Sequence, residues 1–232
     1  MVKDDTKPMI SFIFPCKDEE STVGMCIDKA REVLMSYGHP YEIIVVDNAS
    51  ADSSARIAAA HGALLVRQEK KGYGNALRKG LCKAKGDIRI ICDCDMTYDI
   101  AETGKLLAPL MNGSCDAVIG NRFAGGIKKG AMPLIHVLGV KFLSYIGRKR
   151  FNTWIYDFHC GFRGITGQAL KKLRLRSPGM EFSTEFIAEA SMRGLRITEV
   201  PVSLHKCAYE RKSKLRTIRD GLRHLQYIIY VR

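Results

Sequence analysis

Apolar runs and helix-like segments alternate through the first half of the chain. Runs rich in Ile, Val and Leu are typical of buried strands, and apolar residues recurring every three or four positions are typical of helices. The expected strands are Met9–Phe14, Tyr41–Val46, Leu64–Val66, Ile88–Cys92 and Ala117–Gly120. The expected helices are Ser21–Tyr37, with Ser21 as its cap, Ser50–His61, Gly72–Lys85 and Ile100–Asn112. This alternation predicts an α/β fold in which βαβ units build a parallel sheet.

The second half of the chain is less regular. Leu134–Tyr145 is apolar with one lysine, but it is too short to span a bilayer. We expect a helix over Phe182–Arg193, a strand over Leu195–Val202 and an amphipathic helix over Ser213–Arg232. The apolar positions that recur at helical spacing in the last segment are Leu215, Ile218, Leu222, Leu225 and Ile229. We therefore divide the chain into a domain over residues 1–205 and a basic amphipathic segment over residues 206–232.

Proline and acidic residues follow several of the predicted strands. Pro15 and Asp47 come directly after the first two strands, and Asp93 and Asp95 lie at the end of another. The carboxyl ends of parallel strands form the edge at which α/β sheets bind ligands. Residues i and i+2 of a strand share a face, so Asp93 and Asp95 are expected to point the same way. Such a pair suits Mg²⁺ and a substrate phosphate, and the alternative is an ordinary polar loop.

The composition is that of a globular protein with one main domain. Of its 232 residues, 46% are hydrophobic, and its eight cysteines lack paired zinc spacing. Cys92 and Cys94 flank Asp93 and are expected to pack inside the strand rather than to bind metal. Met1–Pro8 is polar, so we expect no signal peptide, and a reduced cytosolic setting is the simplest interpretation.

The formal net charge of +13 is concentrated in the second half of the chain. Strongly basic proteins bind nucleic acids, anionic membranes or anionic substrates. Because no nucleic-acid motif is recognisable, a non-enzymatic nucleic-acid-binding protein is the remotest hypothesis, and no nucleic acid partner is expected. Basic amphipathic segments favour an anionic membrane surface, and the alternative is that their apolar faces pack on the core.

A series of motifs occurs in an order that is similar to one enzyme family. The motifs are FPCKDEE from Phe14, EIIVVDNASADSS from Glu42, KGYGNALRKGL from Lys71, CDCDMTYD from Cys92, VIGNRF from Val118, DFHCGFR from Asp157 and RKSK from Arg211. Together they resemble the inverting family 2 glycosyltransferases, most closely the polyprenyl-phosphate (dolichyl-phosphate mannose synthase-like) sugar transferases. The resemblance implies a GT-A fold, with a Rossmann-like nucleotide-binding mixed sheet flanked by helices and the catalytic domain over residues 1–205.

The resemblance also implies a nucleotide sugar donor, linked to UDP or GDP, and a Mg²⁺ or Mn²⁺ ion held by Asp93 and Asp95. Asp95 matches the direct metal ligand, and Asp93 is expected near the ribose. Asp47 matches a carboxylate that accepts hydrogen bonds from the base, and Arg122 matches an arginine that binds phosphate. The positions implied to contact the donor are Pro15, Lys17, Glu19, Val45, Asp47, Gly72, Asp93, Cys94, Asp95, Arg122 and Lys214.

The acceptor separates the remaining hypotheses. A lipid phosphate is already anionic at neutral pH and needs positive charge to align it, whereas a hydroxyl acceptor needs a general base. Glu185 lies near the family's base position and joins Asp95 and Arg122 as a candidate catalytic residue; the alternative for Glu185 is a structural pairing with an arginine. The candidate contacts of an acceptor phosphate are Lys128, Lys129, Asp157, Arg163 and Arg211.

We therefore expect a metal-dependent inverting glycosyltransferase that acts on a polyprenyl phosphate at the cytoplasmic face of a membrane. An anionic membrane surface is the expected location, and a membrane-anchoring partner protein is a further partner that this hypothesis allows. The alternative is a soluble family 2 glycosyltransferase acting on a hydroxyl of a saccharide, a peptide or a small molecule.

Overall fold

One mixed β-sheet organises the chain. The computed structural model describes residues 9–207 and 217–231, and its strands form a seven-stranded sheet in the order β3-β2-β1-β4-β6-β5-β7. All neighbouring strands pair in parallel except β6, which runs antiparallel to both β4 and β5. The strands are β1 (Ile10–Cys16), β2 (Tyr41–Asp47), β3 (Leu64–Arg67), β4 (Ile88–Ile91), β5 (Ala117–Asn121), β6 (Arg163–Thr166) and β7 (Ile197–Pro201).

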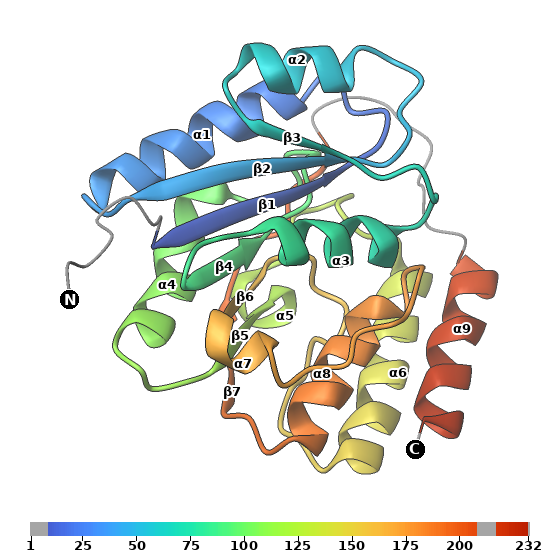
Figure 1. Cartoon of the computed structure of the whole chain (residues 1–232). Helices are drawn as coiled ribbons and strands as arrows, with labels where there is room; N and C mark the ends of the chain where they lie inside the picture. The colour runs from blue at the N-terminus through green and yellow to red at the C-terminus, as the bar shows by residue number, and fades with distance from the viewer. Residues whose placement is uncertain (1–8, 208–216, 232) are drawn as a thin grey trace.

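Helices cover both faces of this sheet. Figure 1 shows α1 and α2 above β1 and β2, α3 and α8 below them, and α6 and α9 together at one side. The helices are α1 (Val23–Ser36), α2 (Ser54–Ala60), α3 (Tyr73–Lys83), α4 (Thr103–Met111), α5 (Arg122–Gly125), α6 (Leu134–Phe151), α7 (Gly167–Leu170), α8 (Phe182–Met192) and α9 (Thr217–Tyr230), with a 3₁₀ turn, η1 (Ile100–Glu102), before α4.

The α3 helix packs closely on the sheet. A Cβ atom at Gly80 would lie 2.6 Å from Cγ2 of Ile13 and 2.9 Å from Cγ2 of Val46, both of which are fully buried. A larger residue at Gly80 would therefore push α3 away from β1 and β2. This close approach helps to hold Tyr73, the first residue of α3, within hydrogen-bond distance of Asp93 beyond β4.

The α/β architecture predicted from the alternation is confirmed, but β6 is not predicted by the sequence pattern. Its residues include the buried Arg163 and Gly164 in place of an apolar run, and its antiparallel insertion makes the sheet mixed. The prediction that Ser21 caps the first helix is wrong. Instead α1 begins at Val23, and the hydroxyl of Thr22 at the N-cap position donates to the carbonyl oxygen of Cys94 at 2.7 Å.

The α9 helix packs against α6 and α8. Ile228 is buried, Arg223 forms a 2.6 Å ion pair with Glu181, and Arg150 donates a 3.0 Å hydrogen bond to the carbonyl oxygen of Val231. The amphipathic helix is therefore present over Thr217–Tyr230, whereas residues 213–216 and 232 of the predicted segment lie outside the described residues. The division of the chain after residue 205 stays a prediction.

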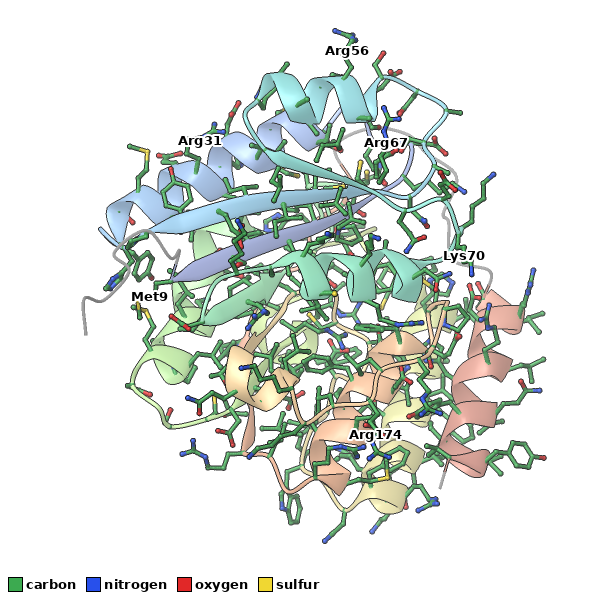
Figure 2. The ribbon with its side chains drawn as sticks, viewed as in Figure 1. Met9, Arg31, Arg56, Arg67, Lys70 and Arg174 are labelled. Atoms are coloured by element: carbon green, nitrogen blue, oxygen red, sulfur yellow. The ribbon has the colours of Figure 1, made fainter. Side chains whose placement is uncertain are left out.

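Charged side chains lie on the outer surface of the helices. Figure 2 shows Arg31 on α1 and Arg56 at the outer side of α2, with Lys70 in the segment that precedes α3. Within the described part of the chain, no helix combines the length and the hydropathy needed to cross a bilayer.

Candidate active site

A cleft of about 860 Å³ lies beyond the carboxyl end of β4 and is bordered by α6 and α9. Its polar lining includes Asp93, Asp95, Arg122, His159 and His224. Its apolar lining includes Met132, Ile135, Val140, Leu143 and Leu204. A cleft that combines carboxylates and a cation with extensive apolar surface suits an amphiphilic ligand.

The predicted acidic pair lines this cleft, but the local geometry differs from the prediction. The β4 strand ends at Ile91, so Asp93 and Asp95 lie in the turn that follows it rather than on one face of the strand. Met96 adopts a left-handed conformation with φ of 61° directly after Asp95. The turn, and not the pleat of a strand, therefore brings the two carboxylates to one cleft.

Each carboxylate of the pair is held by a neighbouring hydroxyl group. The Tyr73 hydroxyl donates to Oδ1 of Asp93 at 3.0 Å, and the Thr97 hydroxyl and amide donate to Oδ1 of Asp95 at 2.5 and 3.0 Å. Burial, followed by the charge of Asp93, raises the pKa of Tyr73 well above its ordinary value, so Tyr73 remains a proton donor. A Cβ atom at Gly161 would lie 2.2 Å from Oδ2 of Asp93, so a larger residue there would displace this carboxylate.

Arg122 is anchored beside the acidic pair by a buried ion pair. Its Nε atom donates to Oδ2 of Asp157 and its Nη2 atom donates to Oδ1, both at 2.7 Å. The same carboxylate also accepts a hydrogen bond from the backbone amide of Arg122. Burial acts to lower the pKa of Arg122, but the charge and hydrogen bonds of Asp157 outweigh it and raise the pKa well above its ordinary value. The contact of Asp157 with an acceptor phosphate stays a prediction, and in the structure its carboxylate is fully buried against Arg122.

The carboxyl end of β2 is tied to the segment that precedes α3. Asn48 donates at 2.9 Å to the carbonyl oxygens of Gln68 and Lys70, and its Oδ1 accepts from the amide of Gly72 at 2.7 Å. Gly72 has φ of 143°, and a Cβ atom there would lie 2.2 Å from the carbonyl oxygen of Pro178. Asn48 therefore shapes this region, and the sequence analysis did not assign it a role.

The other predicted nucleotide contacts fall into two groups. Pro15 and Lys17 lie at and just beyond the end of β1, and Glu19 and Asp47 are largely buried, with Asp47 accepting from the amide of Ser50 at 3.2 Å. Their contacts with a nucleotide stay predictions. The contacts of Val45 and Cys94 with a nucleotide also stay predictions; in the structure Val45 is fully buried inside β2, and the buried thiol of Cys94 donates to the carbonyl oxygen of Pro15 at 3.2 Å.

Two charged residues predicted to act on the substrate are engaged with the backbone. Arg163 is fully buried, and its guanidinium donates to the carbonyl oxygens of Cys160 and Ser183, while its contact with an acceptor phosphate stays a prediction. Both oxygens of Glu185 accept backbone amides, from Arg176 at 2.7 Å and from Ser177 at 2.9 Å. Glu185 is not among the residues that line the cleft, and its partners are amides rather than the arginine side chain that the alternative named. Its assignment as a general base stays a prediction.

The substitution Glu185→Gln tests this structural role. A glutamine can satisfy only one of the two amides with an acceptor oxygen, because its other terminal atom is a donor. We expect the free energy of unfolding to fall by about 1–3 kcal/mol. We also expect kcat/KM for sugar transfer to stay within a factor of about three, since an uninvolved group contributes little to the transition state. Urea unfolding and steady-state kinetics measure the two effects, and a large rate loss at unchanged stability would support the catalytic assignment.

The basic residues predicted to meet the acceptor are only partly placed by the structure. Lys128 and Lys129 are exposed on the loop that leads to the cleft, where the amide of Lys128 donates to the carbonyl oxygen of Leu204 at 2.9 Å. Arg211 and Lys214 lie outside the described residues. Lys206 lines the cleft and was not singled out by the sequence analysis.

Two histidines that line the cleft were also missed. His159 lies inside the DFHCGFR motif, which gave a signal for its location but not for its role, and His224 is a single histidine in an amphipathic helix. Burial, followed by the charges of Arg163 and Arg223, lowers the pKa of His224 to about 4.

The depressed pKa of His224 predicts a loss of stability in acid. The folded state binds the proton more weakly than the unfolded chain, in which histidine titrates near pH 6.5. The contribution of His224 is therefore complete above about pH 6.5 and is lost as the pH falls toward about 4, by about 3 kcal/mol at most. Urea unfolding at pH 7 and pH 4.5 should show a smaller acid effect in His224→Phe than in the unmodified chain, and an equal effect would contradict the prediction.

Comparisons with known proteins identify the family of this chain. The model of the family described as Glycosyl transferase family 2 matches residues 11–174, which is more than half of the chain. The chain belongs to glycosyl transferase family 2. The low-salt glycan biosynthesis hexosyltransferase Agl6 of Haloferax volcanii is 33% identical over 229 residues, which cover 97% of this chain and 54% of Agl6. The dolichol-phosphate mannosyltransferase of Pyrococcus furiosus is 26% identical over 224 residues, which cover 93% of this chain and 62% of that protein.

Solved structures share the fold of this family 2 chain. Glucosyl-3-phosphoglycerate synthase from Mycobacterium tuberculosis, in complex with Mn²⁺, UDP and glucosyl-3-phosphoglycerate, matches with a TM-score of 0.76 at 21% identity, covering 95% of this chain and 80% of that one. The GT-A fold expected from the resemblance is confirmed. The family 2 chain described here spans about half the length of Agl6.

The donor atoms of the cleft fit a hard divalent cation. Asp93 and Asp95 supply carboxylate oxygens to one cleft, and Mg²⁺ is typically bound by one or two carboxylates together with substrate phosphates. Over residues 9–207 and 217–231, no cluster of three or more His, Cys, Asp or Glu side chains is arranged to hold a metal ion. The pair is the candidate metal site because both of its carboxylates line the cleft, with a substrate diphosphate as the further source of oxygen ligands.

Proposed function

We propose that this family 2 protein is a metal-dependent inverting glycosyltransferase that moves a sugar from a nucleotide diphosphate to a polyprenyl phosphate at a membrane surface. The observation that carries the proposal is the amphiphilic lining of the cleft. Arg122 provides positive charge for phosphate groups, Asp93 and Asp95 would do so through a bound cation, and the apolar residues of α6 provide surface for a hydrocarbon chain.

The donor side of the proposal rests on the acidic pair and Arg122. Asp93 and Asp95 would hold Mg²⁺ or Mn²⁺, which, when bound, offsets the negative charge that develops on the departing diphosphate. Arg122, fixed by Asp157, would place a further positive charge beside that diphosphate. The complex of the M. tuberculosis synthase with Mn²⁺ and UDP supports a divalent cation and a uridine nucleotide, whereas GDP remains the alternative.

The acceptor side rests on the cleft lining and on the position of Glu185. A lipid phosphate needs no general base because it is already ionised, and Glu185, the base expected for a hydroxyl acceptor, lies outside the cleft. Ile135, Val140 and Leu143 of α6 line the cleft with apolar surface that matches an isoprenoid chain. The P. furiosus relative named as a dolichol-phosphate mannosyltransferase supports the same acceptor class.

The membrane side rests on the exposed apolar residues of α6 and α9, two helices that pack together, and we call this set of residues the α6–α9 face. Its members are all more than half exposed: Leu134, Ile135, Leu138, Phe142, Tyr145, Ile218, Leu222 and Ile229. Lys141, Arg148 and Lys149 of α6 supply positive charge nearby. Helices with exposed apolar residues and flanking cations lie in the interface of anionic bilayers, so we infer that this face meets the cytoplasmic surface of a membrane, with or without a membrane-anchoring partner.

The double substitution Leu138→Glu and Phe142→Glu should abolish most membrane binding. Each side chain contributes about 1.5–3 kcal/mol when fully buried, so we expect the affinity for vesicles of anionic phospholipid to fall by about 100-fold or more. Met35→Glu on α1, which replaces an exposed apolar residue remote from this face, is the matched control and should bind normally. Vesicle sedimentation measures the effect, and unchanged binding of the double variant would exclude the α6–α9 face as the membrane contact.

A donor screen tests the proposed function. The purified chain is incubated with Mn²⁺ or Mg²⁺ and with UDP- or GDP-linked sugars, and nucleotide release is measured with and without a short polyprenyl phosphate. We expect one donor to be consumed and its turnover to depend on the lipid phosphate. Turnover stimulated by a saccharide or peptide hydroxyl but not by the lipid phosphate would favour the alternative acceptor, and no turnover of any donor would overturn the proposal.

A further inference from the structure

The cleft contains a histidine pair that the proposed donor and acceptor contacts do not use. His159 lies on the loop between α6 and β6, and His224 comes from α9. Their rings meet edge to face, with centroids 4.4 Å apart and an interplanar angle of 83°. The Thr184 hydroxyl of α8 lies 2.8 Å from Nδ1 of His224 and 3.4 Å from Nε2 of His159. Residues from two helices therefore fix the orientation of the His159 ring.

One polar atom of this pair is not satisfied by the protein. Among the residues that the structure describes, Nδ1 of His159 is buried and has no hydrogen-bond partner. A buried polar atom without a partner costs about 1–3 kcal/mol, and most such atoms in folded proteins are paired. His159 also lines the cleft, so a substrate bound there would lie beside this ring.

The surroundings of His159 determine what that partner can be. Burial, followed by the charges of His224, Arg122 and Arg163, lowers the pKa of His159 well below its ordinary value, so the ring is neutral near pH 7. A neutral imidazole donates one hydrogen bond and accepts another, which suits an alcohol hydroxyl better than a phosphate. Anionic groups of the substrate have Arg122 and Lys206 in the same cleft.

We propose that His159 recognises an uncharged hydroxyl group of the nucleotide sugar, and that Thr184 and His224 act as positioning residues for its ring. The inference rests on the proposed function, because a polyprenyl phosphate carries no alcohol hydroxyl and the donor must then supply it. The hydroxyl belongs either to the transferred sugar or to the ribose. His159 would thus help to select the donor without taking part in bond breaking.

Donor analogues that each lack one hydroxyl test the assignment. The probes are deoxy-sugar and 2′-deoxyribose versions of whichever donor turns over fastest among UDP-glucose, UDP-galactose, UDP-N-acetylglucosamine and GDP-mannose. We expect the unmodified protein to discriminate against one analogue by about tenfold or more in kcat/KM. In His159→Phe the ratio of kcat/KM for the complete donor to kcat/KM for that analogue should fall to about one. His159→Gln keeps a neutral donor and acceptor and should retain part of the discrimination. The analogue affected shows whether sugar or ribose supplies the hydroxyl.

The ratio of kcat/KM between the complete donor and its deoxy analogue distinguishes recognition by His159 from a purely structural role. If His159 only supports the fold, His159→Phe lowers kcat/KM for every donor equally and leaves the ratio unchanged, which would overturn the proposal. Thr184→Val serves as a second variant should His159→Phe fail to fold, and we expect it to weaken the same discrimination. His39→Phe, on the loop before β2, is the control and should change neither rate nor ratio. Equal use of all analogues by the unmodified protein also overturns the proposal, whereas failure to use any nucleotide sugar overturns the proposed function itself.

Discussion

Replacing Asp95 with asparagine should lower kcat/KM for sugar transfer by about 100- to 1,000-fold, as expected when a ligand of the cation that would stabilise the departing diphosphate is weakened. Asparagine has nearly the same shape, and its oxygen can still accept from the amide and hydroxyl of Thr97. The turn that carries the residue should therefore persist, and only the negative charge that would hold the cation is lost. The dependence of the remaining activity on Mn²⁺ or Mg²⁺ concentration should shift to higher concentrations.

Asp99→Asn is the matched control for this substitution. Asp99 lies four residues further along the chain, and its carboxylate accepts the amide of Ala101 at the start of η1. It is not among the residues that line the cleft, so Asp99→Asn should retain normal kinetics. Steady-state kinetics over a range of metal concentrations, with circular dichroism to verify the fold, measure both variants. Retention of more than half of the activity in Asp95→Asn would contradict the proposed metal site.

Of the single substitutions that we propose, Asp157→Ala should lower the free energy of unfolding most. In Asp157→Ala the guanidinium of Arg122 would remain buried without its carboxylate, and breaking a buried ion pair in this way costs about 3–5 kcal/mol. The double variant Asp157→Ala with Arg122→Met removes the unpaired charge and should recover part of that loss. Urea unfolding measures the change in the free energy of unfolding for each variant.

The exposed pair of Arg196 and Asp116 provides the control for the buried pair. It has a similar two-point geometry, with Nε and Nη2 of Arg196 donating to the carboxylate at 3.2 and 2.9 Å, but both side chains reach solvent. Because exposed pairs contribute little, Asp116→Ala should cause a much smaller change than Asp157→Ala. Equal losses in the two variants would show that burial does not determine the importance of the Arg122–Asp157 pair.

The residues that could be predicted from the sequence are those that directly follow an apolar run. Asp93 and Asp95 stand out because two acids interrupt the pattern at the end of a strand, and both do line the cleft. The same pattern predicts most of the sheet, because β1, β2 and β4 are apolar throughout or nearly so. β6 escapes prediction because a buried arginine and glycine break the pattern.

The sequence does not reveal partners of a polar side chain that are distant along the chain. Arg163 and Glu185 are assigned to the substrate because of the family resemblance, whereas in the structure backbone carbonyls and amides satisfy them. Asp157 is matched to Arg122, 35 positions away. His159 and His224 meet only because α9 packs on the domain, and nothing in the local sequence of α9 signals that contact.

Analysis of the lipid product tests the central claim most directly. The unmodified chain is incubated with a metal ion, the active nucleotide sugar and a short polyprenyl phosphate, and the lipid extract is examined by mass spectrometry and NMR. The account predicts a lipid whose mass increases by one sugar residue, linked through the phosphate with its anomeric configuration inverted relative to the donor. Nucleotide release without any glycosylated lipid, or a product with retained configuration, would contradict it.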